Sequence, residues 1–119
     1  MKKVLITGGA GFIGSNLAEY YLAKGHRVNV FDNLSRPGGG ARKNIEYLMS
    51  KYKGNPDFEF VQGDVRNLAQ LEKVMVDIDA IFHFGAQTAM TTSIENPVED
   101  FETNALGTFN VLEAARSLA

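Results

Sequence analysis

The chain has 119 residues, no cysteine and a formal net charge of −2. This length suits one domain with a buried core, and the small negative charge favours neither nucleic acid nor an anionic membrane as a partner. Without cysteine the chain has no disulfide and no thiolate chemistry, which fits a reducing, cytoplasmic setting. No stretch approaches the roughly 20 apolar residues of a membrane span.

The first predicted strand, Lys3–Thr7, runs into three spaced glycines, Gly8, Gly11 and Gly14. A predicted helix over Gly11–Lys24 follows at once. In a dinucleotide-binding loop the first glycine lets the chain turn sharply, the second lets the backbone approach a pyrophosphate, and the third lets the helix sit close to the strand. The N-terminus of such a helix offers free N–H groups and a partial positive charge to an anion.

Strands and helices alternate along the rest of the chain. The pattern predicts a strand over Arg27–Phe31, a helix near Arg42–Lys53, a strand over Phe58–Val61, a helix capped by Asn67 with Gln70, a strand over Ala80–Phe84, and one long helix capped by Asn96 that runs towards Leu118. In the first helix we expect one apolar face, made of Ile13, Leu17, Tyr20 and Tyr21.

This alternation predicts an α/β fold, a Rossmann-type doubly wound parallel sheet with strand order 3-2-1-4 and right-handed crossovers. Only the N-terminal half of such a fold is present, because a doubly wound dinucleotide fold normally has two halves. The last residues, Val111 to Ala119, are still good helix formers. We therefore expect residues 1–119 to be one dinucleotide-binding segment of a longer enzyme.

Asp32 ends the second predicted strand, 18 residues after Gly14. A carboxylate at this position accepts hydrogen bonds from the ribose hydroxyls of the adenosine and repels a 2′-phosphate, which favours NAD over NADP. Arg36 is the nearby residue that would instead meet a 2′-phosphate. The alternative interpretation of Asp32 is a turn-forming residue after a strand.

Two further segments follow strand ends at the same predicted rim of the sheet. Asp64 would accept from the adenine amino group while the backbone of Val65 lies along the ring; the alternative is a turn aspartate before a helix. After the fourth strand come small residues that allow the backbone to approach the middle of the cofactor, within the segment Phe84, Gly85, Ala86 and Gln87.

Several residues resemble catalytic groups but are interpreted otherwise. His83 lies in an apolar strand end and is read as a packing histidine, and His26 as a solvated one. The pairs Tyr20/Lys24 and Tyr47/Lys51 match the spacing of a tyrosine base and its lysine, but neither lies where a nicotinamide would be. No metal-ligand cluster is present in the sequence. We therefore assign no catalytic residue to this chain.

The motifs together resemble the extended short-chain dehydrogenase/reductase superfamily, and within it the NAD-dependent nucleotide-sugar epimerases and dehydratases. The residues that carry the resemblance are Thr7–Gly14, Phe31–Leu34, Gly63–Arg66, His83–Ala86 and Asn104–Thr108. Two strings, Asp32–Arg36 and Ala89–Pro97, are similar to the CDP-paratose (CDP-tyvelose) 2-epimerases. The resemblance covers essentially the whole chain.

The resemblance implies a tightly held NAD that takes a hydride from a sugar carbon, C2 in the suspected subfamily, and returns it to the other face of a transient keto-sugar. It implies a CDP-sugar substrate and a homo-oligomeric parent protein. The residues that it places at the cofactor are Gly8, Gly11, Phe12, Ile13 and Gly14 at the pyrophosphate, Asp32, Asn33, Ser35 and Arg36 at the ribose, Asp64 and Val65 at the adenine, Phe84, Gly85, Ala86 and Gln87 along the nicotinamide path, and Asn104 behind the fourth strand.

The chain departs from the family at the point of chemistry. The family's catalytic Ser/Thr follows a fifth strand, its Tyr-x-x-x-Lys lies on the next helix, and its C-terminal lobe holds the nucleotide-sugar; all of these are missing here. We expect no turnover by the 119 residues alone. The alternatives are a parent 4-epimerase, dehydratase or reductase, or a dinucleotide-binding module with no activity of its own.

Overall fold

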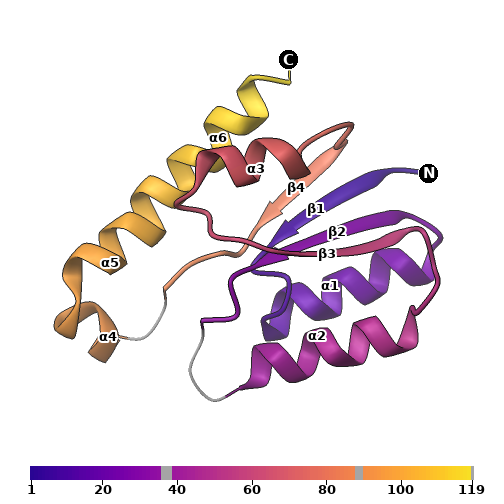
Figure 1. Ribbon diagram of the computed structural model, residues 1–119, viewed down its shortest axis with the longest axis horizontal. Coiled ribbons are helices and arrows are strands. Elements are labelled where there is room, and N and C mark those ends of the chain that lie inside the picture. Colours follow the sequence, from indigo (N-terminus) through magenta and orange to yellow (C-terminus); the bar gives the residue numbers. More distant parts are fainter. Residues whose placement is uncertain (36–38, 88–89, 119) are drawn as a thin grey trace.

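A computed structural model describes residues 1–35, 39–87 and 90–118, without the side chains of residues 90–92. It contains four strands and a series of helices (Figure 1). In chain order these are β1 (Lys3–Thr7), α1 (Phe12–Ala23), β2 (Arg27–Asp32), α2 (Gly40–Lys51), β3 (Phe58–Gln62), α3 (Leu68–Val74), β4 (Ala80–His83), α4 (Met90–Glu95), α5 (Pro97–Phe101), the π-helix η1 (Glu102–Leu106) and α6 (Gly107–Arg116).

The four strands form one parallel sheet in the order β3-β2-β1-β4. The predicted α/β class and strand order are therefore confirmed. In register, Thr7 at the end of β1 lies opposite Phe31 of β2 and His83 of β4. All four strands consequently point their carboxyl ends to the same rim of the sheet, which is where ligands bind in folds of this type.

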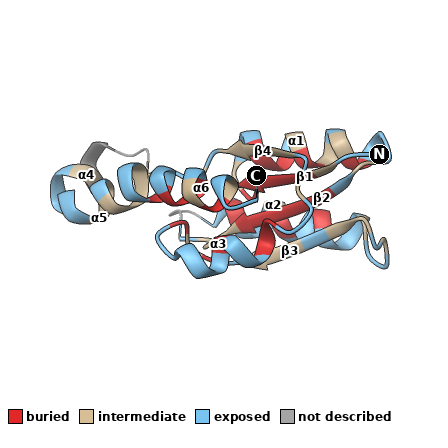
Figure 2. Ribbon diagram, turned by 90° about the horizontal axis from the view of Figure 1, so that it is seen from above, coloured by how far each residue is buried: buried red, intermediate tan, exposed pale blue. Residues whose placement is uncertain are grey.

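The sheet is covered on both faces, and each face has its own core. Figure 1 shows α1 and α2 on one face of the sheet and α3 and α6 on the other. Along β1 the side chains of Val4 and Ile6 join the core with α1 and α2, while Leu5 joins the core with α3 and α6. This alternation follows from the two-residue period of a strand. Burial on both faces explains why β1 reads as an uninterrupted apolar run. Figure 2 shows the buried residues concentrated in the central strands.

The buried face of α1 differs from the predicted one. Its buried residues are Gly14, Ser15, Ala18 and Leu22, whereas Ile13 and Tyr20, both expected inside, are 63% and 54% exposed. Leu17 and Tyr21 are partly buried against the core. The prediction weighted apolar character, but small side chains let a helix approach a sheet closely, and here that close approach decides which face turns inward.

The predicted long final helix is interrupted. A short helix, α4, precedes Asn96, and the turns after it change from α5 to the π-helical η1 and back to α6, where Gly107 N–H bonds to Glu102 O, five residues earlier. The predicted cap is confirmed, because the Asn96 side chain accepts from Glu99 N–H and Pro97 takes the first helical position. No periodicity in the sequence marks the extra residue of the π-turn.

The predicted cap of α3 is confirmed in part. The Asn67 side chain accepts from Gln70 N–H, as expected. The Gln70 side chain, however, does not complete a reciprocal capping box: its Oε1 accepts from Asp64 N–H at 2.9 Å. Gln70 therefore anchors the turn between β3 and α3, where Asp64 lies.

Candidate dinucleotide site

The loop between β1 and α1 leaves little room for a side chain at two of its three motif glycines. Gly8 has φ of +67°, and a Cβ there would lie 2.6 Å from the backbone carbonyl of Phe84. A Cβ on Gly14 would lie 2.5 Å from Gly8 O, whereas one on Gly11 would meet only Gly8 O, at 3.3 Å. The first and third glycines thus have the predicted roles in turning the chain and in close helix packing, and Gly11 leaves the loop open on its outer side.

The N-terminus of α1 is open to solvent. The first helical hydrogen bond runs from Ser15 N–H to Gly11 O, and the helix has no side-chain cap. Within the described residues no acceptor meets the N–H groups of Phe12, Ile13 and Gly14, and the first two residues are 79% and 63% exposed. Three unpaired N–H groups at the positive end of a 12-residue helix form a ready site for a phosphate.

Asp32 lies beside this loop at the carboxyl end of β2. Its Oδ2 accepts from Ala10 N–H at 3.1 Å, and its Oδ1 accepts from Leu34 N–H at 2.8 Å. Each carboxylate oxygen has a second lone pair, so both oxygens remain able to accept from a ligand. The carboxylate is therefore held at the predicted rim, one hydrogen bond from the glycine loop.

Asn33 and Asp64 join the ends of β2 and β3. Asn33 Nδ2 donates to Asp64 Oδ2 at 3.3 Å, and Asn33 Oδ1 accepts from Ser35 N–H at 3.0 Å. The Arg66 guanidinium binds Asp64 through both oxygens, with 2.8 Å between Nη2 and Oδ2, and this bond lowers the pKa of the Asp64 carboxyl. The sequence motifs did not single out Arg66 as a site residue. The signal available in the sequence was its position two residues after Asp64. Arg36, the other arginine near this site in the sequence, falls outside the described residues.

The segment after β4 is held by Asn104. Asn104 Oδ1 accepts from Gln87 N–H at 2.7 Å, and Asn104 Nδ2 donates to Gln87 O at 3.0 Å. Asn104 also donates to Asp100 Oδ1 at 3.1 Å. One amide side chain in η1 thus fixes the backbone at the end of the segment Phe84–Gln87. Phe84, at the start of this segment, is 40% exposed.

Val65 is 7% exposed and belongs to the core beneath α3 and α6. Its carbonyl accepts from Asn110 Nδ2 at 3.0 Å, and its side chain fills the space where a Cβ on Gly107 would lie. The side chain therefore has a packing role. The predicted contact of the Val65 backbone with an adenine stays a prediction.

His83 has a partner on each ring nitrogen: Nδ1 lies 2.6 Å from Thr7 Oγ1 and Nε2 lies 3.0 Å from Thr108 Oγ1. Burial lowers the pKa of its imidazole below the ordinary value of 6.5. A packed, fully hydrogen-bonded histidine agrees with the sequence interpretation. His26, by contrast, lies at the amino-terminal end of the strands, opposite to His83, where its Nδ1 accepts from Lys2 N–H.

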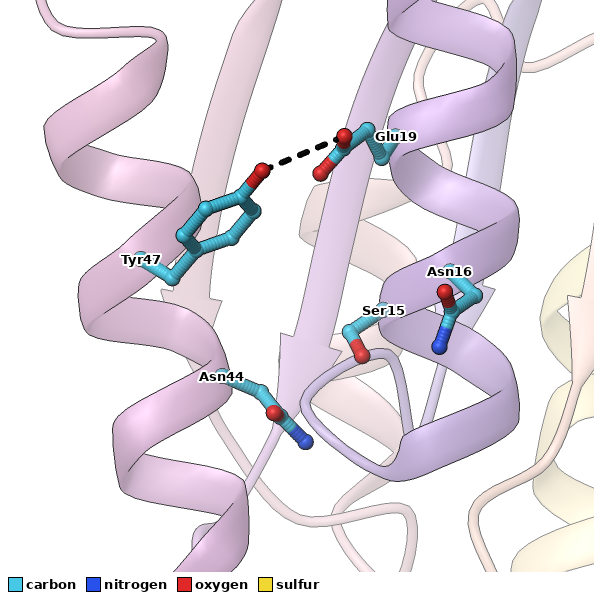
Figure 3. Close-up of a pocket in the computed structure, with 5 residues that line it drawn as sticks. All are labelled: Ser15, Asn16, Glu19, Asn44 and Tyr47. Carbon is cyan, nitrogen blue, oxygen red and sulfur yellow. Dashed lines mark hydrogen bonds between the residues drawn. The ribbon is translucent and has the colours of Figure 1, made fainter.

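The two Tyr-x-x-x-Lys pairs lie on helix surfaces. Lys24 Nζ stacks 5.1 Å from the centre of the Tyr20 ring. Lys51 Nζ binds Glu19 Oε1 at 2.8 Å and Tyr47 OH at 3.3 Å, and the bond to Glu19 raises the pKa of Lys51. Tyr47 also donates to Glu19 and lines a polar cavity of about 270 Å³ between α1 and α2, together with Ser15, Asn16 and Asn44 (Figure 3).

The described residues contain no group of three or more His, Cys, Asp or Glu that is placed to hold a metal ion. Among the helices of the described part of the chain, none is long and apolar enough to cross a membrane.

Residues 5–119 match the protein family described as "GDP-mannose 4,6 dehydratase". The chain is 52% identical over 116 residues to a CDP-paratose 2-epimerase of Salmonella typhi, an alignment that covers 96% of this chain and 32% of that protein. The chain therefore spans about a third of the length of this relative.

Solved structures give the same picture. The UDP-glucose 4-epimerase of Thermus thermophilus, crystallised with NAD, is similar over 97% of this chain and 34% of its own, with a TM-score of 0.76 and 38% identity. A dTDP-glucose 4,6-dehydratase of Streptomyces venezuelae, crystallised with NAD and TYD, is similar over 95% of this chain and 35% of its own, with a TM-score of 0.79 and 34% identity. The fold of the chain is thus that of the N-terminal third of these enzymes.

Proposed function

The chain belongs to the family described as "GDP-mannose 4,6 dehydratase", and on that premise we propose that it is the NAD-binding segment of a nucleotide-sugar epimerase. The observation that supports this most directly is the open N-terminus of α1 next to the Asp32 carboxylate. Three unpaired N–H groups fit a diphosphate, and a carboxylate one hydrogen bond away fits a ribose diol. When bound, NAD supplies reversible hydride acceptance from a sugar carbon.

The roles of the individual residues follow from their positions. Gly8, Gly11 and Gly14 shape the loop, and the N–H groups of Phe12 and Ile13 bind the pyrophosphate. The remaining proposed cofactor residues are Asp32, Asn33, Ser35 and Arg36 at the ribose, Asp64 and Val65 at the adenine, and Phe84, Gly85, Ala86, Gln87 and Asn104 towards the nicotinamide. Arg66 already donates to both carboxylate oxygens of Asp64. An adenine amino group would therefore have to bind a remaining lone pair of the Asp64 carboxylate.

Calorimetric titration of the chain with NAD and NADP tests the cofactor assignment. We expect NAD to bind at least about tenfold more tightly, because the Asp32 charge repels a 2′-phosphate. Asp32→Asn keeps an acceptor but removes the charge, and should bring the two affinities within about threefold of each other. The control is Asp77→Asn, which removes an equal charge from an exposed turn with φ of +60°. Equal binding of both nucleotides by the unchanged chain would contradict the assignment.

For the parent reaction we propose 2-epimerisation of a CDP-dideoxyhexose in a homo-oligomeric protein. The support is the 52% identity to a CDP-paratose 2-epimerase, against 38% to the UDP-glucose 4-epimerase of Thermus thermophilus. The chain itself carries no proposed catalytic residue. Incubation with CDP-paratose and NAD, followed by NMR of the sugar, should therefore show no C2 epimer; formation of the epimer would place the chemistry within these residues.

A further inference from the structure

Three side chains from three elements meet behind the segment Phe84–Gln87. Thr7 ends β1 and is fully buried, His83 ends β4, and Thr108 lies in the first turn of α6. His83 bridges the other two, with 2.6 Å from Nδ1 to Thr7 Oγ1 and 3.0 Å from Nε2 to Thr108 Oγ1. In the chain, Thr7 lies 76 positions before His83 and Thr108 lies 25 positions after it.

The directions of these hydrogen bonds follow from their outer partners. Thr108 donates its single hydroxyl proton to Asn104 O at 2.6 Å, and a carbonyl can only accept. Thr108 Oγ1 must therefore accept from His83, which puts a proton on Nε2. Thr7 Oγ1 accepts from Gly85 N–H at 3.2 Å and still has a proton to donate. That proton matches an unprotonated Nδ1, so the network fits one form of the ring, neutral with its hydrogen on Nε2.

Both ends of this network hold the same segment. At one end Thr7 Oγ1 binds the N–H of Gly85. At the other end Asn104, whose carbonyl is bound by Thr108, grips the N–H and the C=O of Gln87 with its side-chain amide. A charged side chain also joins this network, because Asn104 Nδ2 donates to Asp100 Oδ1 at 3.1 Å.

We propose that His83 is a positioning residue for the cofactor. As the neutral ring with its proton on Nε2, it links Thr7 of β1 to Thr108 of α6 and so holds Phe84–Gln87 at the carboxyl rim. This inference rests on the proposed function, because that function places the cofactor against this segment. His83 itself touches neither cofactor nor substrate in this role.

A matched pair of variants at Thr108 tests the proposal. Thr108 is exposed on the helix surface, so its replacement leaves the core intact. Thr108→Val removes the hydroxyl that receives the His83 proton, whereas Thr108→Ser keeps it. We expect Thr108→Val to weaken NAD binding about fivefold, the effect of one lost hydrogen bond, and Thr108→Ser to stay within about twofold of the unchanged chain. Equal NAD affinity of the two variants would overturn the proposal.

Nitrogen-15 NMR of the imidazole reads the network without any ligand. We expect the unchanged chain to show a protonated Nε2 and an unprotonated Nδ1 at His83, and Thr108→Val to shift this pattern. The amide protons of Gly85 and Gln87 should exchange faster in Thr108→Val than in Thr108→Ser. If the chain fails to bind NAD, the proposed function falls, and these two signals alone decide whether His83 holds the segment. A proton on Nδ1, or equal exchange in both variants, would refute it.

Discussion

Gly8 and Gly25 both have left-handed backbone angles, with φ of +67° and +83°, but only Gly8 is crowded. A Cβ at Gly8 would meet the Phe84 backbone at 2.6 Å, whereas one at Gly25 would meet nothing within 4 Å. We expect Gly25→Ala to lower the free energy of unfolding by about 1 kcal/mol through backbone strain alone. Gly8→Ala should cost about 3 kcal/mol or more, since β4 or α1 must also move, a range typical of overpacking added to strain.

Urea denaturation of both variants measures this difference. NAD affinity gives a second readout, because Gly8→Ala displaces the loop that offers the N–H groups and Gly25→Ala does not. Equal losses of stability in the two variants would mean that the glycine loop has room to relax, and that the close approach of Gly8 to Phe84 is not required.

His83 also gives stability a pH dependence. Burial lowers its pKa below 6.5 in the folded chain, so the unfolded chain binds the proton more readily. Stability rises with pH wherever the unfolded state binds more protons. The free energy of unfolding should therefore be highest above pH 6.5 and should fall as the pH decreases through and below that value. The Asp64 carboxyl, whose pKa is lowered from 3.8, loses its contribution only at lower pH.

Urea midpoints at neutral and mildly acidic pH test this expectation in two proteins. The unchanged chain should lose stability on acidification, because the buried imidazole of His83 resists protonation in the folded state. His83→Gln retains a donor and an acceptor but does not titrate, so its midpoint should change less. If His83→Gln and the unchanged chain show the same pH dependence, the imidazole does not control stability in this range.

At the level of single residues, local spacing predicted some contacts and missed others. The positions of Asp32 and of the glycines are set by the chain within a few residues of the strand ends, so a motif can specify them. The partners of His83 lie on other elements, 76 and 25 positions away, and no local pattern marks Thr7 or Thr108 as those partners. The Asp64–Arg66 pair is local, but its residue types alone do not distinguish a ligand contact from an internal salt bridge.

At the level of elements, the strands were predicted well and the helices less well. A continuous apolar run is typical of a buried parallel strand and specified β1, and all four strands end within a residue of their predicted bounds. The faces of helices depend on packing distance: α1 buries Gly14, Ser15 and Ala18 in preference to Ile13 and Tyr20. The π-helical η1 contains Asn104, whose side chain binds the backbone of Gln87, 17 positions away, and the sequence pattern of a long helix does not encode that contact.

At the level of the whole molecule, two features expose apolar or unpaired surface. β4 is an edge strand that pairs only with β1 in the described sheet. On α6, Phe109 and Leu112 are 57% and 65% exposed, and α5 adds Val98 and Phe101 at 65% each. Figure 2 shows α5 extending beyond the sheet with largely exposed residues. Exposed apolar side chains and an open strand edge each favour association between copies of the chain.

We therefore expect the 119-residue chain to self-associate, with an average mass in sedimentation velocity that rises with protein concentration. Replacing both Phe109 and Leu112 with Gln should shift this equilibrium towards monomer by about tenfold or more, because two large side chains leave the contact. Met49→Gln is the matched control, since Met49 is 51% exposed on α2, on the other face of the sheet. A monomer at all concentrations would show that this surface remains solvated, and an equal response to Met49→Gln would place the contact elsewhere.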